Sequence, residues 1–385
     1  MPRTRKTTTT KTPTQASSLR DSIIAKIEGA VPADILGAPH DFISTRCLAI
    51  DLALRMPGAP VGRLTVIRGW EQAAKSTLGL HLCQETLQRG GVAVLLDTEF
   101  AYDEYRSQKM GINTNENDPD GLIVRQPQTI EDTIKLIEEI IEATREESPD
   151  TLLTIVWDSV AATDTAASLE NEFGESQRAG AHASLMRQAL RRISKKIAQS
   201  QVCLVIINQN SEAVNMGPWA GMGNTDEKDS MVAKRPLQFY ASVIINMYKA
   251  GELKRGSGDK VITYGVKVKG KVVKNKCSHP FGTFEAHCLF DTGFDNDYAY
   301  FETALKLGML IKRGSYYRLP DSEKSFTEAT FGAVLDETLG LREKILDAAR
   351  ETLWPLAAKE KYLNGVSDPA QESPTHEEQE EEEPE

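Results

Sequence analysis

Residues 61–77, VGRLTVIRGWEQAAKST, decide the fold of this chain. An apolar run ends at Gly69, and the letters KST at 75–77 open an amphipathic segment. The order is close to the phosphate-binding pattern G-x-x-x-x-G-K-[ST], with Ala74 where the second glycine is expected. In such a loop, backbone N–H groups and a helix N-terminus together form a nest for phosphate oxygens. The stretch therefore predicts a nucleoside-triphosphate site.

The chemistry of this loop is shared among its residues. The lysine neutralises the β- and γ-phosphates, and the hydroxyl that follows it binds Mg²⁺. Alanine is the smallest alternative to glycine at position 74, so we expect the loop to curl around phosphate despite the substitution. We expect the cofactors ATP and Mg²⁺ to be bound by the whole loop, which comprises Gly69, Trp70, Glu71, Gln72, Ala73, Ala74, Lys75, Ser76 and Thr77.

Apolar strands alternate with helical patterns on both sides of the loop. Val/Ile/Leu-rich runs cover 64–69, 92–99, 152–159 and 202–209, with amphipathic stretches between them. This alternation predicts an α/β fold with a mostly parallel sheet flanked by helices on both faces. The later runs 239–250 and 261–276 are predicted as edge or antiparallel strands.

Composition divides the chain into five parts. A polar, basic arm predicted to be disordered is followed by a segment with helical spacing, and a long α/β core comes next. After the core, the pattern changes to a smaller module, and an acidic low-complexity tail predicted to be disordered follows it. The predicted boundaries are 1–18, 19–45, 46–296, 297–361 and 362–385.

The net charge of −11 is concentrated at one end. Residues 366–385 hold nine carboxylates and no Lys or Arg, which leaves about −2 for residues 1–365. The first twenty residues hold five Lys/Arg and no acid. This arrangement suits a DNA-binding protein whose tail competes for its own basic surface. Solubilising disordered ends explain the same composition.

Several classes are excluded by simple patterns. No apolar run approaches eighteen residues, and the N-terminus has no apolar core, so we expect neither a membrane span nor a secretory signal. An odd number of scattered cysteines without a C-x-x-C pair predicts reduced thiols, a cytoplasmic location and no zinc site. The cysteines are Cys47, Cys83, Cys203, Cys277 and Cys288.

Three polar side chains end predicted buried strands. Asp158 ends LLTIVWDS, where an acid can hold Mg²⁺ through water. Glu99 follows VAVLLDT and can orient and deprotonate an attacking water, although a helix-capping acid is the alternative. Gln209 ends VCLVIINQ, and its amide can bond a γ-phosphate and report it to the next segment.

That next segment, residues 210–233, is long, polar and rich in glycine. Loops of this length are functional or disordered. It contains Trp219 and is followed by Lys234 and Arg235, a combination that suits contact with single-stranded nucleic acid. A flexible insertion is the alternative interpretation.

Taken together, these motifs resemble the RecA recombinase family. The matching stretches, in order, are ISTRCLAIDLAL (43–54), the phosphate loop, DTEFAYDEYRSQKMGI (97–112), WDSVAA (157–162), FGESQ (173–177), INQN (207–210), LQFYAS (237–242) and KGKVVKNK (269–276). The likeness runs from about residue 19 to 350 and includes a C-terminal module and an acidic tail. It implies a RecA-type P-loop NTPase core, a short N-terminal oligomerisation helix and a small α+β C-terminal domain.

The resemblance also implies roles at the nucleotide. Glu99 would be the catalytic base and Gln209 the phosphate sensor. Asp103 and Tyr105 would contact adenine, Tyr105 by stacking. Lys274 and Lys276 would reach into the ATP site of a neighbouring subunit, so that ATP lies between protomers.

Further roles concern DNA and assembly. Segment 19–45 would mediate polymerisation, Phe239 would pack across the filament interface, and module 297–361 would be a gateway for duplex DNA. The first DNA loop would be about 174–181, and residues 210–233 the second. The expected DNA-binding residues are Arg178, Arg187, Arg191, Trp219, Lys234 and Arg235.

The sequence departs from the family pattern in a few places. Ala74 replaces a glycine, the second DNA loop is long, and Gln238 and Ile244 stand where basic residues are common. These departures indicate a divergent member of the family, of bacterial or phage origin.

The favoured function is an ATP-dependent recombinase that forms a helical filament on single-stranded DNA and exchanges strands with a homologous double-stranded DNA. Two alternatives are a ring-forming helicase or DNA-repair motor, and a nucleotide-binding switch that does not hydrolyse.

Overall fold

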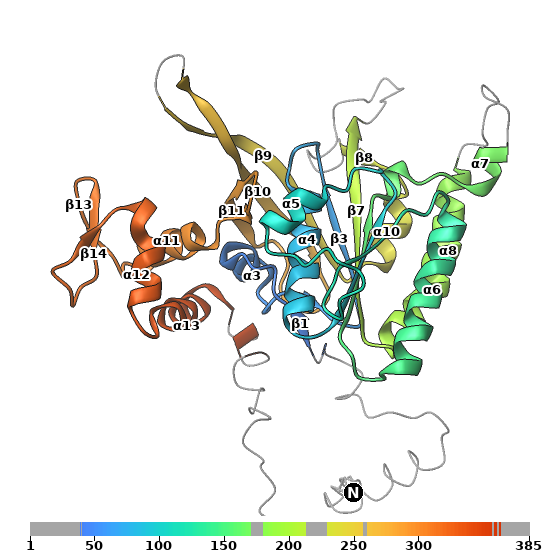
Figure 1. Ribbon diagram of the computed structural model, residues 1–385, viewed down its shortest axis with the longest axis horizontal. Helices are drawn as coiled ribbons and strands as arrows, with labels where there is room; N and C mark the ends of the chain where they lie inside the picture. Colours follow the sequence, from blue (N-terminus) through green and yellow to red (C-terminus); the bar gives the residue numbers. More distant parts are fainter. Residues whose placement is uncertain are drawn as a thin grey trace, which may run out of the picture. The chain divides into compact units, whose positions relative to one another are not determined.

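The strand β3 (Leu64–Gly69), which leads into the phosphate loop, lies in the interior of the central sheet, between β9 and β7 (Figure 1). The computed structural model describes residues 39, 41–170, 180–212, 229–256, 260–355, 358–359 and 362. The chain divides into the compact units Met1–His40 and Asp41–Glu385, and the description below concerns the second. The predicted basic arm, the helical pattern at 19–30 and the acidic tail from 363 onward lie outside the described residues.

Ten strands form one sheet in the order β12-β11-β10-β9-β3-β7-β6-β4-β5, with β8 paired to β7. The pairs among β3, β4, β5, β6, β7 and β9 are parallel, and the remaining pairs are antiparallel. The predicted mostly parallel sheet is therefore confirmed. The strands not yet delimited are β4 (Val92–Asp97), β5 (Ile123–Arg125), β6 (Leu153–Asp158), β7 (Val202–Glu212), β8 (Asp229–Met231), β9 (Val243–Arg255), β10 (Ile262–Asn275), β11 (Thr283–Leu289) and β12 (Gly293–Phe294).

The two predicted late strands have different positions in this sheet. β10 pairs antiparallel with both of its neighbours, as predicted. β9 is an interior strand, parallel to β3 on one side and antiparallel to β10 on the other. It is therefore the strand at which the parallel part of the sheet changes to the antiparallel part.

Helices cover both faces of the sheet because each strand alternates its apolar side chains between two clusters. Val66 and Ile206 point to the cluster that holds α6 (Ile130–Glu147), α8 (Ala181–Gln199) and α10 (Lys234–Tyr240). Their neighbours Ile67 and Ile207 point to the cluster on the opposite face. That second cluster holds α3 (Leu48–Leu54), α4 (Lys75–Gln88) and part of the C-terminal module.

The helix α6 shows how the local sequence sets an element. The Thr129 side chain accepts a hydrogen bond from the backbone N–H of Asp132 at 3.0 Å and caps the first turn. Acidic residues in that turn complement the helix dipole. Its apolar stripe, which includes Ile134, Ile137 and Ile141, packs on the sheet. The helix lies in the amphipathic stretch between the apolar runs 92–99 and 152–159, as the alternating pattern predicts.

After the sheet, the chain forms a small α+β module. A three-stranded antiparallel sheet of β13 (Ile311–Arg313), β14 (Tyr316–Arg318) and β15 (Ser325–Phe326) follows α11 (Asn296–Lys306). Phe301 of α11 packs edge-to-face on the rings of Tyr317 and Phe331 and so joins the helix to the rest of the module. The remaining elements of the described chain are short or C-terminal: β1 (Phe42–Ile43), β2 (Ala59–Pro60), α5 (Glu104–Lys109), α7 (Ala166–Glu170), α12 (Phe331–Glu337), α13 (Leu341–Leu353) and the 3₁₀ turns η1 (Val160–Ala162) and η3 (Glu328–Thr330).

Two general expectations can be compared with the structure. All five cysteines are free, in agreement with the predicted reduced thiols, and all five are buried. Within the described part of the chain, no helix combines the length and the apolar character needed to cross a membrane.

A carboxyl group lies where α3 meets the C-terminal module. Asp51 on α3 lines a cavity of about 180 Å³ together with Asn296 of α11 and Trp354. It accepts hydrogen bonds from the hydroxyls of Ser44 and Thr45, each at 2.7 Å. Burial raises the pKa of Asp51 to about 7, and these hydrogen bonds oppose the rise only in part.

This raised pKa predicts how stability changes with pH. Between pH 4 and 7 the folded chain keeps a proton that the unfolded chain releases, so the free energy of unfolding falls as pH rises, by up to about 1.4 kcal/mol per pH unit. Asp51→Asn stays neutral, so its urea midpoint should fall less between pH 5 and pH 8 than that of the wild type. The exposed control Asp150→Asn should follow the wild type. Equal slopes for wild type and Asp51→Asn would contradict the assignment.

Candidate functional site

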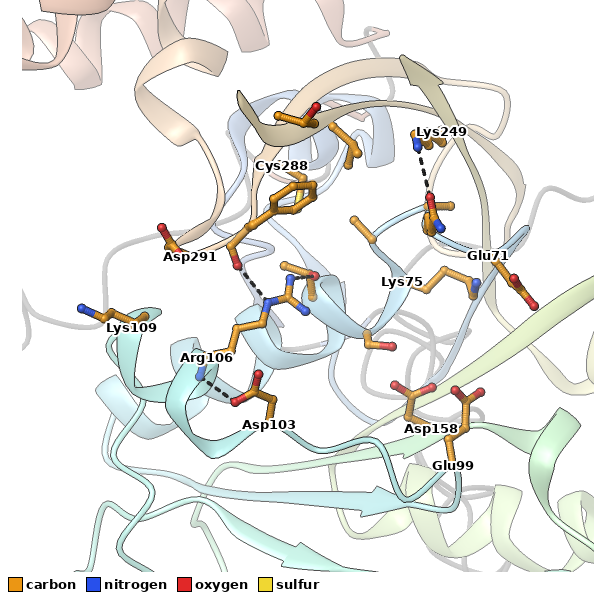
Figure 2. A pocket seen from close by; sticks show the side chains of 18 of the residues that line it. Glu71, Lys75, Glu99, Asp103, Arg106, Lys109, Asp158, Lys249, Cys288 and Asp291 are labelled. Atoms are coloured by element: carbon orange, nitrogen blue, oxygen red, sulfur yellow. Dashed lines mark hydrogen bonds between the residues drawn. The ribbon is translucent and has the colours of Figure 1, made fainter. Parts of the chain in front are cut away.

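The carboxyl ends of the parallel strands meet at a cavity of about 950 Å³ (Figure 2). The register places Gly69 of β3 directly opposite Gln209 of β7, and Asp97 of β4 opposite Asp158 of β6. In open parallel sheets this edge is where ligands bind. Most of the predicted nucleotide residues line the cavity, namely 71–77, Glu99, Asp103, Tyr105, Asp158 and Gln209.

The loop between β3 and α4 has the backbone of an anion nest. Gln72 and Ala74 adopt left-handed conformations, with φ of 57° and 60°. At Gly69, a Cβ atom would lie 2.0 Å from the carbonyl oxygen of Met247 on β9, so only glycine fits. Alternating backbone conformations of this kind turn successive N–H groups toward one point. The loop therefore fits a polyphosphate, although Ala74 stands where glycine is expected.

Lys75 supplies the positive charge of the loop. The residue is only 7% exposed, and its Nζ donates a hydrogen bond to the carbonyl oxygen of Trp70 at 2.8 Å. Burial lowers the pKa of Lys75, while the carboxylates of Asp158, Glu99 and Glu71 act in the opposite direction. The Lys75 ammonium group is thus directed at the interior of the loop, where three carboxylates act on it.

The residues expected to hold Mg²⁺ are adjacent. Burial raises the pKa of Asp158 to about 6, and a hydrogen bond from Ser76 opposes this rise. Among the described residues, no group of three or more His, Cys, Asp or Glu could hold a metal ion. Mg²⁺ uses few protein ligands and completes its shell with water and phosphate oxygens, so one hydroxyl and one carboxylate fit it.

The predicted base and sensor are hydrogen-bonded to each other. Gln209 Nε2 donates to Glu99 Oε1 at 2.9 Å, and the hydroxyl of Ser159 donates to the same oxygen at 2.5 Å. Glu99 Oε2 accepts no hydrogen bond from the described residues. The carboxylate is therefore fixed on one side and open on the other.

At the end of the cavity away from Glu99 and Asp158, the sequence identified Asp103 and Tyr105 but not the other lining residues. Asp103 caps α5 by accepting from the backbone N–H of Arg106 at 3.0 Å. Arg106 itself, with Phe290 and Asp291 from the β11–β12 turn, was not predicted from the sequence. Arg106 lies within the family-like stretch 97–112 but has no assigned role there. No motif marks the turn, which is more than 180 positions from α5 and is brought close only by the fold.

A second group that the sequence did not identify comes from the hairpin of β9 and β10. Lys249 Nζ donates to Gln72 Oε1 at 3.0 Å and pairs with Glu252 at 3.4 Å (Figure 2). Thr263 and Val266 of β10 also line the cavity. The hairpin thus contacts the phosphate loop directly through the side chain of Lys249.

Lys274 and Lys276 do not line this cavity. Lys274 Nζ donates to the carbonyl oxygens of Gln238 and Phe239, and Lys276 Nζ donates to that of Phe239 at 3.3 Å. Burial and the neighbouring Lys276 lower the pKa of Lys274 to about 8. Phe239 is 72% exposed beside them. The two lysines and this ring form one surface cluster away from the nucleotide loop.

The expected DNA-binding residues are only partly described. Arg187 and Arg191 are exposed on α8. Lys234 is half-buried at the start of α10, and Arg235 is exposed there. Arg178 and Trp219 lie outside the described residues. The ends of the predicted second DNA loop pair as β7 and β8, with Asn210 opposite Met231.

The comparisons with known proteins agree with this geometry. The model of the RecA N-terminal domain matches residues 35–295. The chain is 35% identical to Protein RecA of Thermus thermophilus over 83% of this chain and 88% of that protein. It is 31% identical to Protein RecA of Acidothermus cellulolyticus, over 82% and 85%. It is 32% identical to Protein RecA of Bacillus cereus, over 85% and 88%.

The chain belongs to the RecA family. The resemblance inferred from the motifs is thus confirmed, as is the RecA-type α/β core. Membership places the chain among the ATP- and DNA-binding proteins of recombination and repair.

The loop of this RecA-family chain carries a strain that can be measured. A left-handed conformation costs an L-residue about 1–2 kcal/mol, which glycine avoids. Glycine also loses more entropy on folding. Ala74→Gly should therefore raise the free energy of unfolding by about 0.5–1 kcal/mol in urea denaturation.

The matched control is Ala198→Gly within α8, which should lower the free energy of unfolding by about 1 kcal/mol. If Ala74→Gly also unfolded at lower urea than the wild type, the left-handed strain at Ala74 would be disproved.

Proposed function

We propose that this RecA-family chain is a DNA-dependent ATPase that forms a helical filament on single-stranded DNA and exchanges strands with a homologous duplex. The observation that carries the proposal is the hydrogen bond from Gln209 to Glu99. Gln209 lies on β7, which runs on without a break into the segment 210–233 predicted to contact DNA. Strand β7 would thus link Gln209, which bonds the proposed base Glu99, to the proposed DNA loop.

Four groups around the cavity would each bind a different part of the nucleotide and its metal ion. Lys75 binds the β- and γ-phosphates, and the loop N–H groups orient the triphosphate. Bound Mg²⁺ neutralises developing charge on the phosphate oxygens. Ser76 would hold the ion directly and Asp158 through water.

Glu99 is suited to be the general base. Ser159 and Gln209 fix its Oε1, which leaves Oε2 to accept a proton from the attacking water. Once a γ-phosphate is present, the amide of Gln209 has a second acceptor. A change of partner at Gln209 would shift β7, and with it the DNA loop.

A neighbouring copy of the chain would complete the nucleotide site. Lys274 and Lys276 donate to carbonyl oxygens at the surface, next to an exposed aromatic ring. Such a cluster suits contact with a second copy of the chain, in which the lysines would reach that copy's triphosphate. A head-to-tail contact that does not close forms a helical filament. Single-stranded and double-stranded DNA would be the partners, in the bacterial cytoplasm.

The role of Glu99 predicts a specific kinetic defect. Glu99→Gln keeps the hydrogen-bonding shape but cannot take a proton. ATP turnover in the presence of single-stranded DNA should fall about 10²- to 10⁴-fold, while ATP and DNA binding remain. Steady-state phosphate release and equilibrium ATP binding measure the two effects.

Lys75→Ala is the control, because it should abolish ATP binding as well as turnover. Rapid hydrolysis by Glu99→Gln would exclude it as the base. A wild-type chain that binds ATP without any DNA-stimulated release would instead support the non-hydrolysing switch, and closed rings in electron micrographs would support the ring motor.

The lysine cluster can be tested by mixing inactive variants. A Lys274→Ala, Lys276→Ala double variant and Glu99→Gln should each be inactive alone. If the lysines act on the neighbour, an equal mixture should regain about a quarter of the wild-type rate, because one in four random neighbour pairs joins an intact base to intact lysines. A mixture as inactive as its components would show that the lysines act within one chain.

A further inference from the structure

The backbone of the phosphate loop is strained and has few hydrogen bonds of its own. Residues 70–74 contain no glycine, yet Gln72 and Ala74 have left-handed conformations, with φ of 57° and 60°. This conformation is costly for residues other than glycine, and it persists only where surrounding contacts enforce it. Within the described chain, no backbone–backbone hydrogen bond reaches residues 70–73. The shape of the loop therefore depends on side chains and on packing against neighbouring elements.

Two side chains of the described chain form hydrogen bonds to residues 70–73. Lys75 Nζ donates to the carbonyl oxygen of Trp70 at 2.8 Å, and Lys249 Nζ donates to Gln72 Oε1 at 3.0 Å. In the proposed function Lys75 binds the phosphates of ATP, so its bond to Trp70 is given up. The bond from Lys249 then remains, and it acts on a residue whose backbone is left-handed.

Strand β9 brings Lys249 to the loop. Met247 of β9 lies opposite Gly69 in the parallel register, and its carbonyl oxygen leaves no space for a Cβ atom there. Lys249 follows two residues later on the same strand and lines the cavity together with Gln72 (Figure 2). β9 therefore contacts the loop at its first residue and again at a strained residue in its middle.

We propose that Lys249 is a positioning residue for nucleotide binding, whose hydrogen bond to Gln72 keeps the loop in the left-handed shape that binds phosphate. The inference rests on the ATP site of the proposed function and adds to it a side chain of the β9–β10 hairpin. An empty loop that leaves this shape must return to it when ATP binds, and the apparent affinity falls with the fraction of chains that hold the shape. Lys249 raises that fraction before the nucleotide arrives.

This role predicts how paired changes at the two positions affect nucleotide affinity. Lys249→Met and Gln72→Ala each remove the hydrogen bond and leave the strain, so each should weaken Mg²⁺–ATP binding about three- to tenfold in equilibrium titrations. Gln72→Gly removes the same bond together with the strain, so it should recover most of the loss seen for Gln72→Ala. In the Gln72→Gly background, Lys249→Met should cause no further loss. Lys249→Arg keeps a donor and should recover most of the loss seen for Lys249→Met.

Lys254 on the same hairpin provides the matched control. Its ammonium group pairs with Glu252 at 3.0 Å, as that of Lys249 does at 3.4 Å, but Lys254 is not among the residues that line the cavity. Lys254→Met removes the same charge from the hairpin and should leave ATP affinity unchanged. Thermal unfolding without nucleotide checks that each variant is folded.

Several results would overturn this role. A loss of the same size for Lys249→Met in the Gln72→Gly background would mean that Lys249 contacts the nucleotide itself. A Gln72→Gly variant as weak as Gln72→Ala would mean that the bond does not oppose backbone strain. An equal loss for Lys254→Met would reduce the effect to the charge of the hairpin. Full affinity in both Lys249→Met and Gln72→Ala would show that the loop keeps its shape without the bond.

A measurement on Lys75 separates this inference from the proposed function. If Lys75→Ala bound ATP as well as the wild type, the phosphate site itself would be disproved, and the role of Lys249 with it. If Lys75→Ala lost ATP binding while Lys249→Met kept full affinity, only the role of Lys249 would be disproved.

Discussion

Parallel pairing of β3 with β7 is the constraint on which the site depends. It places Gly69, where the phosphate loop begins, opposite Gln209, where the predicted DNA loop begins. β9 lies on the other side of β3, and the Met247 carbonyl approaches Gly69 so closely that no side chain fits there. The first residue of the loop is therefore held between two neighbouring strands.

The sequence predicted the parts of the site that lie on or directly after parallel strands. Glu99, Asp158 and Gln209 each end an apolar run, and strands of one parallel sheet bring their ends to one edge. Sequence reasoning could place them together without knowing any distance. It could not show that Gln209 bonds Glu99, because that contact depends on the side-chain conformations and on the register of strands far apart in the chain.

The residues that the sequence missed share a different origin. Arg106, Lys249 and Phe290 reach the cavity from a short helix, a long hairpin and a turn. The hairpin residue and the turn residue lie outside the quoted motifs. The positions of Lys249 and Phe290 depend on the part of the sheet in which β9, β10, β11 and β12 pair antiparallel.

The cavity combines two kinds of electrostatic environment. Near the loop, Lys75 is enclosed by carboxylates and shielded from water, so charges there interact strongly. Near Arg106, the lining residues Asp103, Tyr105 and Lys109 are exposed, so water and salt screen the charges there more strongly. The two ends of the cavity thus offer a ligand different electrostatic environments. A motif marks the buried end, whereas the exposed end also includes side chains of the distant β11–β12 turn, which only the fold brings close.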